Sequence, residues 1–331
     1  MSEPEWQQLV QKLLGTLPNV ASYQSGSFET LGYTLGKALA TDPSKVPPSL
    51  VQKSTELLIQ ILSAPLPSHM LVAGCKSVGA IFQFASLTDA SLVKLLFKLL
   101  QSEERTVVEA AAAALGDIFV GTRHPEWEDS ALDALFSCSE NKSPEVLLTC
   151  GESLTMAAIG RHSTAFIDPL APRSPQQQSL LAFPASALAS TAAQQVIPAF
   201  EDEPMRKILQ RVFGLFSQSQ LKRSSGCVWL LTMVRHCSEH KLVARNAQGI
   251  QEMFLSLLAD PNDLTQDAAA RGLVLMHENG DETAKADLVQ SLFSNISASS
   301  ASKQAPLKLT SSEDVIFQPG TLGELPKEVG Q

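Results

Sequence analysis

The stretch RTVVEAAAAALGDIFVG, residues 105–121, decides the fold because it predicts a helix that needs a neighbour on each side. Its five consecutive alanines favour a helix and keep the side chains short. Apolar residues recur in it at helical spacing and form one stripe: Val108, Ala112, Leu115 and Phe119. A lone helix that buries so little surface is marginal in water. We therefore expect similar helices elsewhere in the chain.

The same arrangement of small residues recurs along the chain at intervals of roughly 40 residues. Aligned with Gly116, the equivalent positions are Gly36, Gly79, Thr155, Thr232 and Val274. The interval between the third and fourth of these is about two periods, which predicts a repeat partly replaced by a loop. A period of this length built from helix pairs is typical of HEAT and armadillo arrays. The sequence therefore predicts an all-α solenoid of antiparallel helix pairs.

Helix pairs are predicted where two segments with helical apolar periodicity flank a short turn. The pairs are 49–63 with 68–85, 88–101 with 105–120, 127–138 with 144–160, 203–217 with 221–238, and 247–259 with 264–278. Further helices are expected at 2–16, 28–41 and 281–294. Ser143 and Pro144 provide an N-cap and an N1 residue for the helix that follows them. Ser27 with Thr30 resembles a weak capping box.

Segments rich in proline and serine divide the chain into four parts. We expect HEAT-like repeats over 1–162, a Pro/Gln/Ser-rich loop or degenerate repeat over 163–202, HEAT-like repeats over 203–295, and a flexible tail over 296–331. The second part contains five prolines and a run of glutamines at 176–178. Loops of this length within a compact array are uncommon and are usually functional or disordered.

Composition and charge restrict the partners of the chain. Hydrophobic residues make up 44% of the sequence and aromatic residues only 6%, which favours helix-on-helix packing over a β-sandwich. The formal net charge is −9, whereas binding to nucleic acid needs a basic face. No apolar run reaches the ~18 residues of a membrane helix, and the acidic N-terminus lacks a signal-peptide core. We therefore expect neither a nucleic-acid partner nor membrane insertion.

The cysteines are expected in the core rather than in disulfides. Their number is odd and they form no CxxC pair: Cys75, Cys138, Cys150, Cys227 and Cys237. Three of them stand four or five residues before a repeat position, where the 105–121 helix has alanine. Cysteine behaves as a small hydrophobic residue at such places, and cytosolic chains rarely form disulfides.

One cluster has the residue types of a zinc site. His236, Cys237 and His240 stand at the end of the predicted 221–238 helix, where histidines at positions i and i+4 would share one face. No fourth ligand with suitable spacing follows them. Histidine near a helix C-terminus also interacts favourably with the helix dipole. We favour that interpretation, and we expect no metal and no other cofactor.

No other combination of residues supports catalysis. His162, Ser163 and Asp168 have the residue types of an acyl-transfer triad, but no GxSxG elbow surrounds the serine. Several glycines inside helical segments match no phosphate-binding fingerprint and are better explained by close helix contacts: Gly32, Gly36, Gly74 and Gly79. The Arg-Ser-Pro tripeptide around Ser174 is of a phosphorylation type that chance often produces. We assign no catalytic residue and do not expect an enzyme.

The last third of the chain resembles a known protein family. The segments are GCVWLLTMVRHCSEHKLV at 226–243, IQEMFLSLLADPNDLTQDAAARGLVLMHENGD at 250–281 and EDVIFQPGTLG at 313–323. Together they are similar to the proteasome adaptor and scaffold family of very large HEAT-repeat proteins. The run QDAAARGLVLMHENG at 266–280 is the most specific part. Residues 315–318 would match a short strand-like element that follows a helix pair in that family.

This resemblance implies a function in protein binding. It suggests a section of a HEAT solenoid that binds the 26S proteasome, or links it to other cell components, in the cytoplasm and the nucleus. Family members are several times longer, so we interpret the sequence as a fragment, a short isoform or a truncated gene product. No short motif marks the contacts, so no interaction residue is assigned. The alternative is a generic HEAT module of transport-factor type that binds a peptide or a small GTPase.

The last predicted helix is expected to leave part of an apolar face exposed. It carries apolar residues at Ala284, Leu288, Leu292 and Phe293, and the sequence that follows is too polar to form another core-facing helix. The end of a repeat array needs a polar cap. We therefore expect self-association or a partner at this end, with residues 315–317 able to cover only part of the face.

Overall fold

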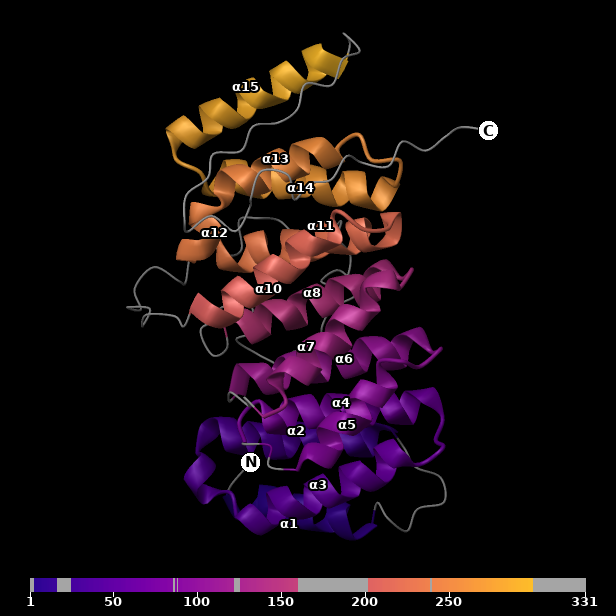
Figure 1. Cartoon of the computed structure of the whole chain (residues 1–331). Coiled ribbons are helices and arrows are strands. Elements are labelled where there is room, and N and C mark those ends of the chain that lie inside the picture. Colours follow the sequence, from indigo (N-terminus) through magenta and orange to yellow (C-terminus); the bar gives the residue numbers. More distant parts are fainter. Residues whose placement is uncertain are drawn as a thin grey trace. The chain divides into compact units, whose positions relative to one another are not determined.

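A computed structural model describes residues 3–16, 25–85, 87, 89–121, 126–159, 202–238 and 240–299. Every regular element in these ranges is a helix, as the sequence predicts (Figure 1). The chain forms two compact units, which we call unit 1 and unit 2. Unit 1 comprises Met1–Cys138 and Glu152–Gln178, and unit 2 comprises Ser139–Gly151 and Ser179–Gln331. The boundary falls inside helix α8 (Pro144–Ile159), so each unit contains one part of that helix.

Unit 1 consists of two layers of helices. Besides its part of α8 it contains α1 (Glu3–Thr16), α2 (Ser25–Thr41), the 3-10 turn η2 (Pro43–Lys45), α3 (Pro48–Ser63), α4 (Ser68–Phe82), α5 (Ala90–Leu99), α6 (Arg105–Gly121) and α7 (Glu128–Ser137). The first helices of the pairs, α1, α3, α5 and α7, contact one another in order, and so do the second helices, α2, α4 and α6. This is the packing of a helical-repeat solenoid.

Helix α6 is the element that its sequence predicts, and its apolar stripe lies in the core. Ala112 and Leu115 are fully buried, and Val108 and Phe119 are nearly so. The helix packs against α4 and against its pair partner α5. The hydroxyl of Ser153, in α8, donates a 2.7 Å hydrogen bond to the carbonyl oxygen of Ala112. The short side chains of α6 therefore permit close neighbours, as expected.

Glycines stand where the second helices of unit 1 approach one another most closely. A Cβ built on Gly32 would lie 2.6 Å from the Cα of Ser77, and one on Gly36 would overlap the carbonyl oxygen of Ala80. The same construction at Gly116 places a Cβ 3.0 Å from the Cα of Ser153. No real side chain fits at such distances from another backbone. A Cβ on Gly74 or Gly79 would likewise lie too close to a side chain of a neighbouring helix, so the predicted role of Gly32, Gly36, Gly74 and Gly79 in close helix contacts is confirmed.

Serines at one repeat position link neighbouring second helices. Ser77 and Ser153 each stand two residues before a repeat position identified from the sequence. The Ser77 hydroxyl lies 2.6 Å from the carbonyl oxygen of Phe28 in α2, to which it donates. Both serines are buried, so the bond formed by each satisfies a hydroxyl that would otherwise be costly to bury.

Unit 2 repeats the architecture of unit 1. It contains the first part of α8, the 3-10 turn η3 that begins at the unit boundary (Cys138–Glu140), α10 (Asp202–Leu215), α11 (Gln220–Cys237), α12 (Lys241–Arg245), α13 (Ala247–Leu257), α14 (Asp263–Asn279) and α15 (Glu282–Ser299). Helix α10 pairs with α11 and α13 with α14, while the second helices α11 and α14 contact each other. Trp229 of α11 is fully buried, and its Nε1 donates a 2.8 Å hydrogen bond to the carbonyl oxygen of Leu147.

Most predicted helix boundaries agree with the structure, and three differ. Helix α2 begins at Ser25, so Ser27 lies inside the helix and the predicted capping box is wrong; the Thr30 hydroxyl instead bonds back to the carbonyl oxygen of Gly26 at 2.6 Å. The short helix α12 was not predicted, because five residues carry too little periodicity. Helix α15 continues beyond residue 294 to Ser299. The Ser143 cap is confirmed, since its hydroxyl accepts a hydrogen bond from the Val146 amide.

Two segments of the predicted organisation lie outside the residues that the structure describes. Residues 163–201 of the expected loop or degenerate repeat lie outside the described residues, and so do residues 300–331 of the expected tail. The division of the chain into repeats, loop and tail therefore stays a prediction.

Candidate interaction surface

The residues that have the residue types of a zinc site, His236, Cys237 and His240, do not share one helical face. Helix α11 ends at Cys237, so His240 lies beyond the helix and the expectation that both histidines share one helical face is wrong. The Nδ1 atom of His240 accepts a hydrogen bond from the amide of Leu242 at 3.2 Å and caps α12. Within the described residues, no three His, Cys, Asp or Glu side chains gather in an arrangement suited to a metal ion.

The other histidine of this cluster is neutral near physiological pH. Burial, together with the charge of Arg235, lowers the pKa of His236 to about 3. A neutral ring lacks the charge that interacts most favourably with a helix dipole. The His236 side chain as a whole is partly exposed, but its Nε2 atom is inaccessible to solvent, and this loss of hydration disfavours the charged ring.

The cysteines lie in the core, as predicted. All five are reduced and buried. Burial raises the pKa of the Cys75 thiol to about 12, and it also raises the pKa values of Cys227 and Cys237. A thiol with a raised pKa is a poor nucleophile and a poor metal ligand. These side chains therefore fill space between helices.

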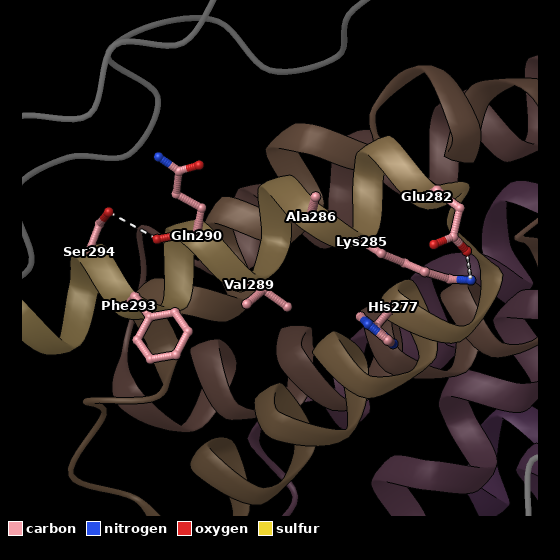
Figure 2. A pocket seen from close by; sticks show the side chains of 8 residues that line it. All are labelled: His277, Glu282, Lys285, Ala286, Val289, Gln290, Phe293 and Ser294. Atoms are coloured by element: carbon pink, nitrogen blue, oxygen red, sulfur yellow. Dashed lines mark hydrogen bonds and ion pairs between the residues drawn. The ribbon is translucent and has the colours of Figure 1, made fainter.

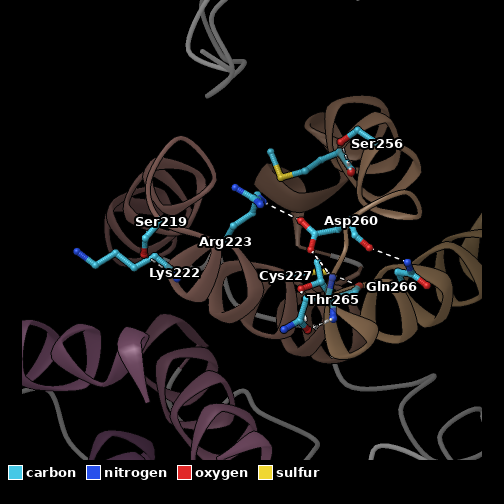
Figure 3. Close-up of polar contacts among 10 residues, drawn as sticks. Ser219, Lys222, Arg223, Cys227, Ser256, Asp260, Thr265 and Gln266 are labelled. Carbon is cyan, nitrogen blue, oxygen red and sulfur yellow. Dashed lines mark hydrogen bonds and ion pairs between the residues drawn. The ribbon is translucent and has the colours of Figure 1, made fainter. Parts of the chain in front are cut away.

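Unit 2 contains a buried ion pair that the sequence analysis did not identify, between Arg223 and Asp260 (Figure 3). The Nε atom of Arg223, in α11, donates to the Oδ2 atom of Asp260 at 2.8 Å, and the two side chains are 9% and 4% exposed. Asp260 also accepts from the Asn262 amide at 2.9 Å, and its carbonyl oxygen accepts from the Gln266 side chain at 2.6 Å. The pair therefore holds the turn between α13 and α14 against α11.

Two sequence signals could have indicated this pair. Arg223 directly precedes a run of small and apolar residues in α11, and the turn Asp260-Pro261-Asn262-Asp263 offers several acceptors. A charged side chain is rarely buried unless it has a partner. The partner is 37 positions away in sequence, so only the packed structure identifies it.

The candidate interaction surface is an open groove between α14 and α15, with a volume of about 860 Å³ (Figure 2). We call it the α14–α15 groove. One residue of α14 and seven of α15 line it: His277, Glu282, Lys285, Ala286, Val289, Gln290, Phe293 and Ser294. Figure 2 shows Val289 and Phe293 projecting from the same side of α15 into the space beside α14.

Large apolar side chains remain exposed at this groove. Val289 is 41% exposed and Phe293 is 67% exposed. Val274, on α14 one turn before His277, is 56% exposed. In contrast, Leu288 of α15 is buried and attaches the helix to the unit. The expectation that the last helix leaves part of an apolar face uncovered is therefore confirmed for the described residues. Ala284, which that expectation named among the face residues, is itself exposed.

One end of the groove is charged. The Nζ atom of Lys285 lies 2.9 Å from the Oε1 atom of Glu282, and the two side chains are 31% and 93% exposed. The hydrogen bond from Lys285 lowers the pKa of Glu282. Because an ammonium group has three donors, Lys285 can bind a second carboxylate. The groove thus offers an apolar floor with a cation at one end.

The remaining candidate residues belong to a part of the chain that the structure does not describe. His162, Ser163, Asp168 and Ser174 lie outside the described residues. None of the described helices combines the length and the hydropathy needed to cross a membrane.

The packing of its helices places the chain in the class of all-α helical-repeat proteins. Among proteins of known role, it is 28% identical over its whole length to the human proteasome adapter and scaffold protein ECM29, of which it spans 18%. It is 30% identical over 203 residues to the proteasome component ECM29 of Saccharomyces cerevisiae, covering 59% of this chain and 10% of that protein. No protein-family model matches the chain. The resemblance noted from the sequence is confirmed, and the chain corresponds to a section of these much larger proteins.

A third relative and several solved structures also match. The proteasome-associated ECM29 homologue of Drosophila melanogaster is 31% identical over 104 residues, which are 31% of this chain and 5% of that protein. An engineered protein of known structure is 16% identical, with a TM-score of 0.43 and coverage of 81% of this chain and 98% of that one. A designed armadillo repeat protein is 17% identical, with a TM-score of 0.37 and the same coverage. The fold assignment rests on the packing of this chain's own helices.

Proposed function

We propose that this chain is a protein-binding section of a helical-repeat scaffold that docks on the 26S proteasome. The observation that carries the proposal is the match of the whole chain to a human protein named as a proteasome adapter and scaffold. The fold agrees with that role, because a helical-repeat array presents long surfaces for partner binding.

The role is one of binding rather than catalysis. Two observations on the described residues support this: His240 caps α12, and the cysteines are buried. The acidic composition, with a net charge of −9, favours a protein partner over a nucleic acid. The proposed location is that of the proteasome, in the cytoplasm and the nucleus.

Cosedimentation with purified 26S proteasomes tests this function. The full chain, at micromolar concentration, should sediment with the proteasome through a glycerol gradient, whereas a designed armadillo repeat protein of similar size should remain at the top. The same two proteins serve as baits in cytosol, where only this chain should enrich proteasome subunits. Enrichment of transport factors without proteasome subunits would instead identify a generic HEAT module.

A further inference from the structure

We propose that residues 313–317 of the same chain, Glu-Asp-Val-Ile-Phe, bind in the α14–α15 groove as an extended segment that runs parallel to α15. Two neighbouring apolar side chains of the groove, Val289 and Phe293, are exposed, and adjacent exposed apolar groups can bind an apolar segment. Between residues 300 and 331 the triplet at 315–317 is the one place where three apolar residues stand in succession. The segment and the groove therefore both present apolar side chains.

The spacing of the two sets of side chains agrees. Three groove residues recur every four positions on one face of α15: Lys285, Val289 and Phe293. This spacing places their Cβ atoms about 5–6 Å apart. In an extended segment, alternate residues share one side and stand about 6.6 Å apart. In the proposed segment these alternate residues are Glu313, Val315 and Phe317. The two series match in order as well as in spacing. Glu313 would face Lys285, Val315 would face Val289, and Phe317 would face Phe293.

Charge selects the direction of the segment. In the parallel orientation Glu313 reaches Lys285, which has donors left beyond its contact with Glu282. In the opposite orientation Glu313 would lie beside Phe293 and leave its charge without a partner. The aromatic ring of Phe317 instead covers Phe293, an arrangement that stabilises beyond the area buried.

The connection between the end of α15 and residue 313 is long enough for the segment to reach the groove. Helix α15 has 18 residues and ends at Ser299, so its axis is about 27 Å long. Residues 300–312 form a connection of thirteen residues, which spans up to roughly 43 Å when extended. The connection therefore reaches the first turn of α15 with slack.

A tethered segment fits the groove better than a second copy of the chain does. Eight residues line the groove, whereas stable protein interfaces use about 20–30 residues on each side. A segment on a short flexible connection has an effective concentration in the millimolar range. A small apolar groove with one cation therefore favours the chain's own segment.

Disulfide trapping in the full chain tests the proposal. The pair Val289→Cys with Phe317→Cys should form an intramolecular disulfide under mild oxidation, seen as a faster-migrating monomer on a non-reducing gel. The native cysteines are all buried and do not compete. Asp287 is exposed on the opposite side of α15, so Asp287→Cys with Phe317→Cys is the matched control and should not cross-link. Cross-linking of both pairs at one rate would overturn the proposal.

The direction is tested by moving the cysteines. Lys285→Cys with Glu313→Cys should cross-link, whereas Phe293→Cys with Glu313→Cys should not. In the 289–317 pair, Lys285→Glu should slow trapping about two- to fivefold, and adding Glu313→Lys should restore it. The reverse cross-linking pattern would refute the parallel orientation.

Two further outcomes overturn the proposal altogether. A disulfide found only in dimers would assign the groove to a second copy of the chain. If none of the pairs is trapped, while circular dichroism shows that the variants remain helical, the segment does not bind in the groove.

Discussion

The two sides of helix α14 differ in how completely they are covered. On the side of α11 and α13, Ala268 and Ala269 are fully buried, and a Cβ built on Gly272 would lie 2.5 Å from the Phe254 ring. On the side of α15, the exposed side chains of Val289 and Phe293 line the α14–α15 groove. Small residues let the first neighbours approach to contact, whereas larger apolar residues on the other side lack a complete cover.

This difference shows where stability and binding are located. Polar contacts add to the packing of α11 against α14 and the turn before it. Arg223 and Asp260 form a buried ion pair, and the Cys227 thiol lies 3.6 Å from the Thr265 carbonyl oxygen. The α14–α15 groove has one exposed ion pair. We expect substitutions in the first contact to change the free energy of unfolding, and substitutions in the groove to change binding instead.

The largest expected effect is at the buried ion pair. Asp260→Ala leaves the Arg223 charge buried without its partner, which should cost about 3–5 kcal/mol of unfolding free energy. Urea denaturation followed by circular dichroism measures the loss. Asp267→Ala removes the exposed partner of Arg271 and should change stability by less than about 1 kcal/mol. Equal effects at the two sites would show that burial does not set the cost.

The second prediction compares the substitution of alanine by leucine at a buried position of α6 and at an exposed position of α15. Ala112→Leu places three extra carbon atoms in the packed contact of α6 and should destabilise unit 1 by about 1–3 kcal/mol. Because neighbouring repeats stabilise one another, the loss should spread along the array. Ala286→Leu, at an exposed position of α15, should change stability by no more than about 0.5 kcal/mol. An unchanged melting temperature for the first variant would mean that α6 is not tightly packed.

The third prediction uses pH to probe the buried end of α11. The pKa of His236 is about 3 in the folded protein and about 6.5 in an unfolded chain. Between these values the unfolded chain binds more protons, so stability is complete above pH 6.5 and decreases as the pH falls toward 3. The loss should reach about 1 kcal/mol at pH 5.5. Denaturation at several pH values checks it, and His236→Gln should remove this part of the dependence.

The smallest expected effect on stability is at the groove itself. Phe293→Ala removes a side chain that is mostly exposed, so the free energy of unfolding should change by less than about 0.5 kcal/mol. The same variant should increase hydrogen exchange of the amides at residues 315–317, because their contact is lost. A loss of more than about 2 kcal/mol would show that Phe293 belongs to the core.

Much of the fold could be predicted because it depends on local spacing. The period near 40 residues, the apolar stripe of α6 and the glycine contacts all follow from which residues are small and how often they recur. The resemblance to proteasome scaffolds was likewise visible in residues 266–280 and agrees with the relatives found. The exposed Phe293 was foreseen because no apolar helix follows it directly.

The errors arose where the end of an element or a distant neighbour decides the chemistry. His236 and His240 stand four positions apart, but α11 ends between them, so they do not share one helical face, and His240 caps α12 instead. The partner of Arg223 is far away in sequence. In both cases the three-dimensional arrangement determines the charge and the bonding of the side chain.

The sequence by itself determined the helical-repeat architecture, because the spacing of apolar and small residues is a local property that specifies which helix faces are buried. Only the tertiary structure decided which polar groups pair and where a face remains open, as at the Asp260 turn and the α14–α15 groove. Those outcomes depend on the desolvation of particular atoms by residues distant in the chain. That is also why the groove and its cation at Lys285 became visible only once α14 and α15 were packed together.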